Sequence, residues 1–445
     1  VLWFGAIKNG QVGFAPRWFK DDRERFFRAR NAQGKEMFAI SPFCKAAIEA
    51  DSEAFVLLMQ RIKRQDPKGH IVIMVQPENE TGCAGMKNDR DHSPAGIEAW
   101  RAQVPSVLID YLSEHDGRLM SWLQEAWRGH GKRSRGTWAE VFGDGRAGHH
   151  IFMSYYMARF VEQVARAGRA VHNLPMYAND WLGSLERPGG PIGGPDFQAM
   201  DIWRCAAPSL FALAPDIYVP PFKKWCAAYN VKGNPLLIPE AGGRHFRSGV
   251  SAQCWYAFVQ HDAMLFAPYL NIGDEFNPDH RQSKPYFEIS HLRSSYPMLS
   301  NMRRLILEKQ GCEPREMTAF MVDRSDKADE TYQKSLGGVS LTARSLTGVP
   351  DAQDSQDMVP PFACVFRMDE GQFLIVGTKM SVTFRRENHN LEVQEASLGQ
   401  YIEDHWELQG PMEATEHGGA VILDLPTDAL QIEQVWLSVM LESTQ

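Results

Sequence analysis

The stretch Ile71–Gly82, IVIMVQPENETG, decides how the rest of the chain is interpreted. Its β-branched and apolar residues, Ile71–Val75, end in an acidic and amide-rich tip, Gln76–Glu80. This pattern is typical of a buried parallel strand whose carboxyl end opens into a site, and in a (β/α) barrel that end carries the chemistry. The alternative is an ordinary buried strand followed by a solvated acidic loop.

The composition is that of a globular protein. The chain has 445 residues, of which 44% are hydrophobic and 23% charged, so it has room for two or three domains or for one barrel with an appendage. Its net charge of -8 argues against nonspecific nucleic-acid binding and against an anionic membrane surface. No apolar run approaches the roughly 18 residues that span a bilayer. The seven cysteines are odd in number and lack CxxC spacing, which predicts free thiols.

Helical and strand-like patterns alternate over the first two thirds of the chain, which predicts an α/β fold. Apolar spacing predicts helices over Ala46–Gln65, Ser251–His261 and Ile289–Leu307, and a further one through Met153–Val164 that Gly168 ends. The expected strands are Val1–Gly5, Ile71–Val75, Ala170–Tyr177, Leu210–Tyr218, Leu236–Glu240 and Leu265–Ile272. These six strands are two short of a closed (β/α)8 barrel.

The composition and the pattern of apolar residues change after about residue 310. Asp323–Pro360 is rich in Ser, Asp, Gly and Thr, which predicts a linker or excursion. Short strand-like runs without helices then follow from Cys364–Met368 to Gln434–Met440, and the alternation of Val382 and Phe384 fits half-buried antiparallel strands. The expected domains are therefore an α/β barrel over 1–310, a linker over 311–360 and a small all-β, sandwich-like domain over 361–445.

Three local motifs have competing interpretations. The glycines of Arg187–Pro195 suggest a phosphate cradle, but the prolines and the missing Lys-Ser/Thr favour a long loop at the mouth of the barrel. The pair His149-His150 and the run Asp89–His92 lack the spacing of metal ligands, so no metal is expected. A glycan on the Asn79-Glu80-Thr81 sequon would block the mouth, so the sequon is interpreted as coincidental.

Two expected strands end in glutamate, Glu80 and Glu240. If both belong to one parallel barrel, their carboxyl groups lie at the same end of it. Two facing carboxyl groups are what glycosidic bond cleavage requires: one protonates the leaving oxygen, and the other attacks the anomeric carbon or activates water. The proton donor needs an apolar or like-charged environment to stay protonated.

At this point the residues resemble a known family. Val75–Gly82, VQPENETG, is similar to the QxENExG signature of the β-galactosidases of glycoside hydrolase family 35, which are retaining enzymes built on (β/α)8 barrels. The resemblance implies that Glu80 is the acid/base and that the amide of Asn79 contacts the sugar 2-hydroxyl. It also implies that Glu240, in Leu237–Ala241, is the nucleophile.

The resemblance extends along most of the chain and includes a β-rich C-terminal domain. The segments that carry it are Leu2–Gly5 (LWFG), Trp138–Gly143 (WAEVFG), Met176–Trp181 (MYANDW), Ala214–Tyr218 (APDIY) and Phe362–Phe384. Two departures stand out. The family barrel has two strands before the one that LWFG resembles, so the chain is expected to be a fragment or to have lost them. Pro77 stands where the family more often has Val, and because proline supplies no ladder donor, pairing is expected to stop there.

Several polar and aromatic residues fall at expected strand ends and are candidates for contact with a sugar. They are Trp3, Asn179, Trp181, Tyr218 and Glu275. Each could equally pack at the mouth of the barrel, but as a group they suit a saccharide. Tyr218 is expected to hydrogen-bond Glu240 and keep it ionised.

The sequence therefore predicts a retaining β-glycosidase without a cofactor, a β-galactosidase by resemblance, that acts on an oligosaccharide or glycoside. Two alternatives stay open: the same machinery acting on a β-glucoside or β-arabinoside, and a non-catalytic carbohydrate-binding remnant of a barrel. Neither nucleic acid nor a membrane is an expected partner. A homo-oligomer is compatible with the sequence, and the compartment, a bacterial cytoplasm or periplasm, is left open.

Overall fold

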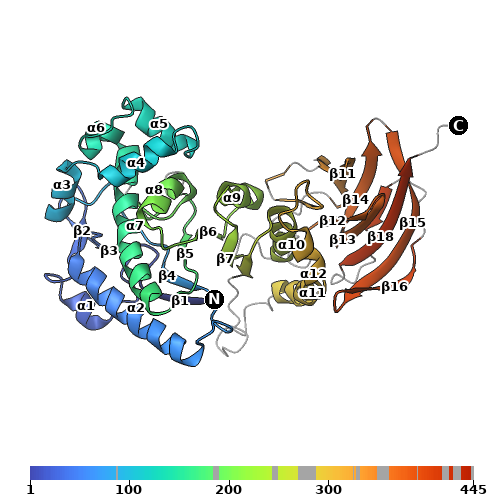
Figure 1. Cartoon of the computed structure of the whole chain (residues 1–445), viewed down its shortest axis with the longest axis horizontal. Coiled ribbons are helices and arrows are strands. Elements are labelled where there is room, and N and C mark those ends of the chain that lie inside the picture. Colours follow the sequence, from blue (N-terminus) through green and yellow to red (C-terminus); the bar gives the residue numbers. More distant parts are fainter. Residues whose placement is uncertain are drawn as a thin grey trace. The chain divides into compact units, whose positions relative to one another are not determined.

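The computed structural model describes residues 1–86, 89–183, 190–242, 249–268, 287–323, 325–326, 331–347, 360–387, 389–412, 420–423 and 432–441 (Figure 1). The chain divides into two compact units. The first consists of Val1–Asp216 and Val231–Leu237, and the second of Ile217–Asn230 and Ile238–Gln445.

The first unit is mixed α/β. Its strands are β1 (Leu2–Lys8), β2 (Arg28–Arg30), β3 (Glu36–Ile40), β4 (Val75–Asn79), β5 (Tyr177–Asp180) and β6 (Ala212–Ile217), the last of which ends one residue into the second unit. Its helices are α1 (Arg17–Asp21), α2 (Lys45–Gln65), α3 (Pro94–Arg101), α4 (Ser106–Glu114), α5 (Ser121–Gly129), α6 (Trp138–Phe142), α7 (Arg146–Val171) and α8 (Met200–Ala206), with a short 3-10 turn, η1, over Phe197–Ala199.

Four of these strands run parallel in the order β1, β4, β5, β6. β1 pairs with β4, a parallel bridge joins Val75 to Met176 ahead of β5, and β5 pairs with β6 from Tyr177–Ala212 to Asp180–Pro215. The carboxyl ends of parallel neighbours lie at one edge, so the residues that end these strands are brought together. Helices α2 and α7 pack against each other and against this layer (Figure 1).

The strand expected over Ile71–Val75 lies elsewhere. β4 consists of Val75–Asn79, so the acidic and amide-rich tip is itself the strand, and Ile71 and Ile73 are 79% and 55% exposed. The carboxylate of Asp66, at the end of α2, explains the shift. It accepts hydrogen bonds from the backbone N–H groups of His70, Ile71 and Val72 at 2.7–2.9 Å, so these groups are not available to a neighbouring strand.

β5 is displaced in the same direction. The strand expected over Ala170–Tyr177 consists of Tyr177–Asp180, because α7 continues to Val171 and the chain then turns. The sequence context of Gly168 predicts that it ends this helix. In the structure, Gly168 lies inside the helix. A Cβ atom at Gly168 would stand 2.3 Å from a ring carbon of Phe55 on α2, so the absence of a side chain permits the close approach of α2 and α7.

The second unit begins with α9 (Phe222–Tyr229), β7 (Leu237–Ala241), α10 (Val250–His261), β8 (Leu265–Pro268), α11 (Phe287–Asn301) and α12 (Arg303–Lys309). β7 and β8 are neighbours in a sheet. The expected helix Ile289–Leu307 is thus two helices, and the expected strand Leu265–Ile272 ends at Pro268 within the described residues.

The remainder of this unit is β-rich. Its strands are β9 (Met317–Met321), β10 (Thr331–Leu336), β11 (Val339–Ser345), β12 (Phe362–Asp369), β13 (Gln372–Thr378), β14 (Met380–Arg386), β15 (His389–Ile402), β16 (His405–Pro411), β17 (Ala420–Leu423) and β18 (Glu433–Leu441). They form one hydrogen-bonded network in the order β10-β11-β14-β15-β18-β13-β12-β9, with β16 beside β15 and β17 beside β14 (Figure 1).

Alternate residues of these strands share one hydrophobic core. Val382 and Phe384 are both buried, as their alternation predicts, and they pack with residues such as Leu341 and Val435. Part of the span 311–360, expected as a linker, belongs to this structure, because β9, β10 and β11 lie within it. In β10 and β11 the apolar residues are too sparse to stand out in the sequence, since each of these two strands buries one face only, whereas all five residues of β9 are buried.

The sequence predicts free cysteines and no segment long and apolar enough to span a bilayer. All seven cysteines are free thiols, as the lack of paired spacing predicts. Among the described residues, no helix combines the length and the apolar character needed to cross a bilayer.

The contact between α2 and α7 leads to a first prediction. Gly168→Ala introduces a methyl group against Phe55, and overpacking of this kind costs about 1–3 kcal/mol. This exceeds the gain in helix propensity, about 1 kcal/mol. We therefore expect a lower midpoint of urea unfolding. Gly129→Ala is the matched control, because a Cβ atom there meets open space at the end of α5. An unchanged midpoint for Gly168→Ala would show that the two helices have room to separate.

Candidate active site

The carboxyl end of β4 is a buried cluster of polar residues. All five residues of the strand are buried, and Glu80, which follows it, is 4% exposed. The backbone is unusual here, because Glu78 and Glu80 both adopt left-handed conformations, with φ of 63° and 43°. Non-glycine residues rarely adopt this conformation, and it persists where the surroundings enforce it.

Side-chain amides connect the ends of three neighbouring strands. The N–H of Glu80 donates to Oδ1 of Asn179 at 2.9 Å. Nδ2 of Asn179 donates to Oδ1 of Asn79 at 3.2 Å and to Oδ2 of Asp216 at 2.6 Å. Nδ2 of Asn79 lies 3.5 Å from Oε2 of Glu80. Asn79, Glu80, Asn179 and Asp216 therefore form one network, which we call the Glu80 network.

Asp216 is a member that the sequence analysis did not assign to the site. It is fully buried in β6, and one of its carboxyl oxygens lies within 4.8 Å of one of Glu80. Its signal in the sequence was its place near the end of an apolar strand, the same signal that marked Asn179. Two carboxyl groups this close repel each other unless one carries a proton.

A second segment packs against the residues that follow Glu80. The N–H of Cys83 donates to the carbonyl of Ile192 at 2.9 Å, and the N–H of Ile192 donates back to Cys83 at 3.2 Å. A Cβ atom at Gly82 would stand 2.9 Å from that same Ile192 carbonyl, so glycine is needed for the close approach. The described part of the Gly/Pro-rich loop, residues 190–195, thus lies beside the Glu80 network.

Glu240 belongs to the second unit, where it lies in β7 and is half-buried. The hydroxyl of Tyr218 donates to its Oε2 at 2.6 Å, which confirms the expected hydrogen bond. The contact is possible because Gly242, just after β7, donates its N–H to the carbonyl of Ile217 at 3.3 Å and so holds the two segments together.

The other expected site residues have different surroundings. Trp3 is 39% exposed, and its described contacts are with Phe14, whose ring centroid lies 5.3 Å away, and with the Lys8 ammonium at 5.3 Å. Trp181 follows β5 directly and is half-buried. Glu275 lies outside the described residues.

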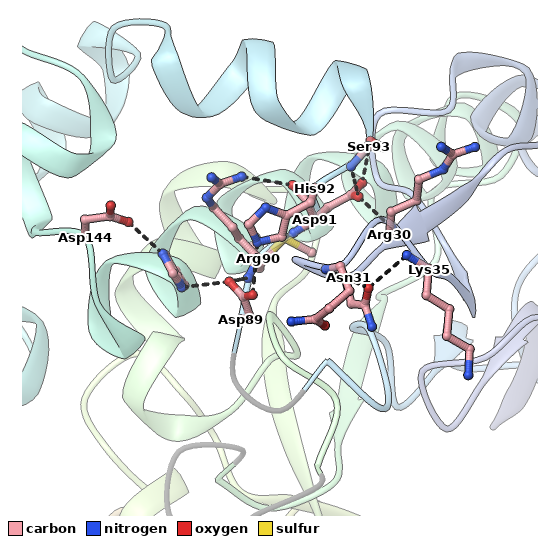
Figure 2. Close-up of polar contacts among 12 residues, drawn as sticks. Arg30, Asn31, Lys35, Asp89, Arg90, Asp91, His92, Ser93 and Asp144 are labelled. Carbon is pink, nitrogen blue, oxygen red and sulfur yellow. Dashed lines mark hydrogen bonds and ion pairs between the residues drawn. The ribbon is translucent and has the colours of Figure 1, made fainter.

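The run Asp89–His92 and the pair His149-His150 take part in ion pairs. Asp89 lies 3.0 Å from Nε2 of His92 and 3.1 Å from Nδ1 of His149, whose Nε2 lies 2.9 Å from Asp144 (Figure 2). Although burial opposes it, these hydrogen bonds raise the pKa of His149 and lower that of Asp89. The buried His150 ring lies 3.0 Å from Asp196. These partners hold the segment after Glu80 against α7.

Asp91, in the same run, connects that segment to β2 and α3. Its carboxylate accepts from the N–H groups of Arg30 and Ser93 and from the hydroxyl of Ser93 at 2.8–3.0 Å (Figure 2). It also accepts from the hydroxyl of Ser41 at 2.6 Å. A buried carboxylate with four donors is a structural anchor, because its desolvation is compensated in full.

The Glu80 network leads to a second prediction. Asn179→Asp keeps the acceptor for the N–H of Glu80 but removes both amide donors and adds a carboxylate beside Asp216. We expect the free energy of unfolding at pH 7 to fall by about 1–3 kcal/mol, as for buried acceptors left unpaired, measured by urea titration. Asn173→Asp is the control, because its exposed Oδ1 accepts only from Arg169 among the described residues. Equal stability of the two variants would contradict the donor role of Asn179.

Comparisons with family models and with solved structures each give matches. A family model described as a domain of unknown function (DUF5597) matches residues 292–412. A comparison with curated proteins finds no match.

Three similar solved structures are β-galactosidases. The β-galactosidase of Bacillus circulans sp. alkalophilus is 10% identical to this chain, with a TM-score of 0.40. The alignment covers 97% of this chain and 88% of that enzyme. The cold-adapted enzyme of Rahnella sp. R3 is 11% identical with a TM-score of 0.37, covering 97% and 88%. A catalytic mutant of the GH42 enzyme Gan42B of G. stearothermophilus is 10% identical with a TM-score of 0.39, covering 97% and 87%. One of these three enzymes is named as a member of family GH42, and the resemblance to family 35 stays a prediction.

Proposed function

We propose that this chain is a retaining β-glycosidase, specifically a β-galactosidase, that hydrolyses terminal β-galactosides by double displacement. The observation that carries the proposal is the Glu80 network, in which a buried Asn-Glu pair at the end of a parallel strand is held by Asn179 and Asp216. A carboxyl group oriented by side-chain amides at such a strand end suits proton transfer to a glycosidic oxygen.

In the first step Glu240 attacks the anomeric carbon and Glu80 donates its proton to the leaving oxygen. The glycosidic C–O bond breaks, and an ester forms between the sugar and Glu240. The hydrogen bond from Tyr218 supports this role, since a donor to Oε2 at 2.6 Å fixes the orientation of the Glu240 carboxyl group. In the second step Glu80 removes a proton from water, which attacks the ester and releases the sugar with retained configuration.

The surroundings of Glu80 support its role as the proton donor. It is almost completely buried, and a carboxyl oxygen of Asp216 lies within 4.8 Å of one of its own. Burial and a neighbouring carboxylate both favour the protonated form of an acid. We propose that the amide of Asn79 contacts the sugar 2-hydroxyl, and that Trp3, Asn179, Trp181, Tyr218 and Glu275 line the sugar site.

The proposal includes an architecture. The parallel order of β1, β4, β5 and β6, with α2 and α7 packed on them, is what part of a (β/α)8 barrel requires. We assign residues 1–310 to the barrel and 361–445 to a sandwich-like β domain, to which the span expected as a linker, 311–360, contributes β9, β10 and β11.

The role of Glu80 is tested by Glu80→Gln. Loss of a general acid costs about 10²–10⁴-fold when the leaving group needs a proton. We expect a loss of that size in kcat/KM on an aryl β-galactoside with a poor leaving group, and a much smaller loss with a good one. Glu98→Gln, exposed on α3, is the control. Equal losses on both substrates would argue against the acid/base role.

The role of Glu240 is tested by Glu240→Ala. Without the nucleophile, turnover of an activated aryl β-galactoside should fall by about 10⁴-fold or more. Added azide should restore it and give the α-galactosyl azide, because a single displacement inverts the anomeric centre. NMR of the product reads the configuration. Unimpaired turnover of this variant would exclude Glu240 as nucleophile.

The wild-type chain on the same substrates distinguishes the alternatives. Faster turnover of an aryl β-glucoside or β-arabinoside than of the β-galactoside would assign another sugar. Sugar binding without turnover of any aryl glycoside would identify a carbohydrate-binding protein.

A further inference from the structure

A buried carboxyl group takes part in the pairing of β1 with β4. Regular pairing runs from Leu2–Val75 to Phe4–Pro77, after which β1 advances four residues, to Lys8, while β4 advances two, to Asn79. The side chain of Glu78, 1% exposed, fills this irregularity. Its carboxyl oxygens accept from the N–H groups of Ile7 at 2.7 Å and Ala6 at 3.4 Å.

A second buried carboxyl group contacts Glu78. Asp51, on α2, is 8% exposed, and its carboxyl group lies within hydrogen-bonding reach of that of Glu78. Two carboxyl groups hydrogen-bond to each other only if one of them carries a proton. Burial, together with Asp51, raises the pKa of Glu78 well above its ordinary value, and burial raises the pKa of Asp51.

Several other charged groups on the elements around Glu78 have partners of their own. On β1, the Lys8 ammonium lies over the rings of Trp3 and Phe14. On α7, His150 lies against Asp196, and Glu162 accepts from Ser209. On β5, Asp180 accepts from the N–H of Gly183. Among the described residues, Asp51 is thus the titratable group that acts most strongly on Glu78.

The position of Glu78 is coupled to the backbone that carries Glu80. Both residues have left-handed φ angles, and one residue separates them. A Cβ atom at Gly5 would stand 2.6 Å from Oε2 and 2.8 Å from Cα of Glu78, so β1 encloses the residue tightly. The N–H of Glu80 then reaches Asn179, and its carbonyl accepts from the N–H of Gly10 at 2.8 Å. A shift of Glu78 would disturb both contacts.

We propose that Glu78 and Asp51 share one proton and act as a positioning pair, which holds the strained end of β4 in the conformation that presents Glu80. This inference rests on the proposed function only for the role of Glu80. The proton is needed because, without it, two buried carboxylates would face each other and separate β4 from α2.

The pair makes stability depend on pH with a defined sign. The pKa values of Glu78 and Asp51 are raised in the folded chain, so the folded state holds a proton that the unfolded chain releases above about pH 4. The stabilisation is complete below that pH and is lost as the pH rises through the raised pKa.

The proton is tested with amide variants of each residue. In Glu78→Gln, the amide oxygen accepts from Ile7 and the amide nitrogen donates to Asp51; in Asp51→Asn, the amide donates to the Glu78 carboxylate. The infrared difference spectrum at pH 7, wild type minus each amide variant, should contain a band of a buried protonated carboxyl group; any band from Glu80 is present in both chains and cancels. Both variants should also weaken the decline of Tm with rising pH. Glu53→Gln, exposed on the same helix, should give no such difference band and should keep the decline. A difference spectrum without the band for both amide variants would overturn the shared proton.

Positioning is tested with Asp51→Ala, which removes the partner without a substitute. We expect faster hydrogen exchange at the amides of Ile7 and Glu80 and a fall in kcat of ~10-fold or more, because small displacements of catalytic groups are costly. The two amide variants should keep kcat near the wild-type value. Wild-type exchange at Glu80 in Asp51→Ala would exclude a positioning role. If Asp51→Ala does not fold, the two amide variants decide. Hydrogen-exchange rates and kcat equal to those of the wild type in both variants support positioning, and a lower kcat with faster exchange in both opposes it.

These readouts separate the pair from the proposed function. The infrared band, the dependence of Tm on pH and the exchange rates need no substrate. A wild-type chain that turns over no glycoside but shows all three would reject the glycosidase and retain the pair.

Discussion

The end of β4 depends on how the chain supplies acceptors for two N–H groups of β1 where the regular ladder between β1 and β4 ends. Pro77 has no N–H group, and regular pairing with β1 ends at that residue, although Asn79 pairs again opposite Lys8. The expectation that pairing stops at Pro77 is therefore wrong, because β4 continues to Asn79 and pairs again there; only the regular register ends at Pro77. Between these points the carboxyl group of Glu78 acts as the acceptor for two N–H groups of β1 that the ladder leaves free. A buried side chain thus takes the place of a backbone carbonyl.

This replacement has consequences for the residues around it. The chain must adopt left-handed conformations at Glu78 and Glu80, which cost of order 1–3 kcal/mol each and persist only where contacts enforce them. The Glu80 network and the hydrogen bond from Gly10 are such contacts. Behind them, α2 and α7 approach closely at Gly168 and give the strands a rigid support. Strain near the candidate acid/base is thus balanced by packing.

Buried charge in the first unit follows one rule. Asp91 accepts from four donors, and His149 lies between two carboxylates. Glu78 meets two backbone donors and one acid. Each group has at least one partner that is distant in sequence, so these buried and half-buried groups connect separate segments of the first unit.

The sequence by itself determined that helices and strands alternate over the first two thirds of the chain and that strands follow without helices towards its end. The 3.6-residue spacing of apolar side chains placed the helices α2 and α10, and short apolar runs placed β1, β6, β7 and most strands of the β-rich region, because these patterns reflect burial on one face. It also marked Asn79, Glu80, Asn179 and Glu240 as strand-end residues. Only the tertiary structure decided that the polar tips of β4 and β5 are strands themselves, that Asp216 joins the Glu80 network, and that Asp51 contacts Glu78. The physical reason is that a polar residue is buried only where partners from other segments satisfy its hydrogen bonds, and no local pattern encodes those partners.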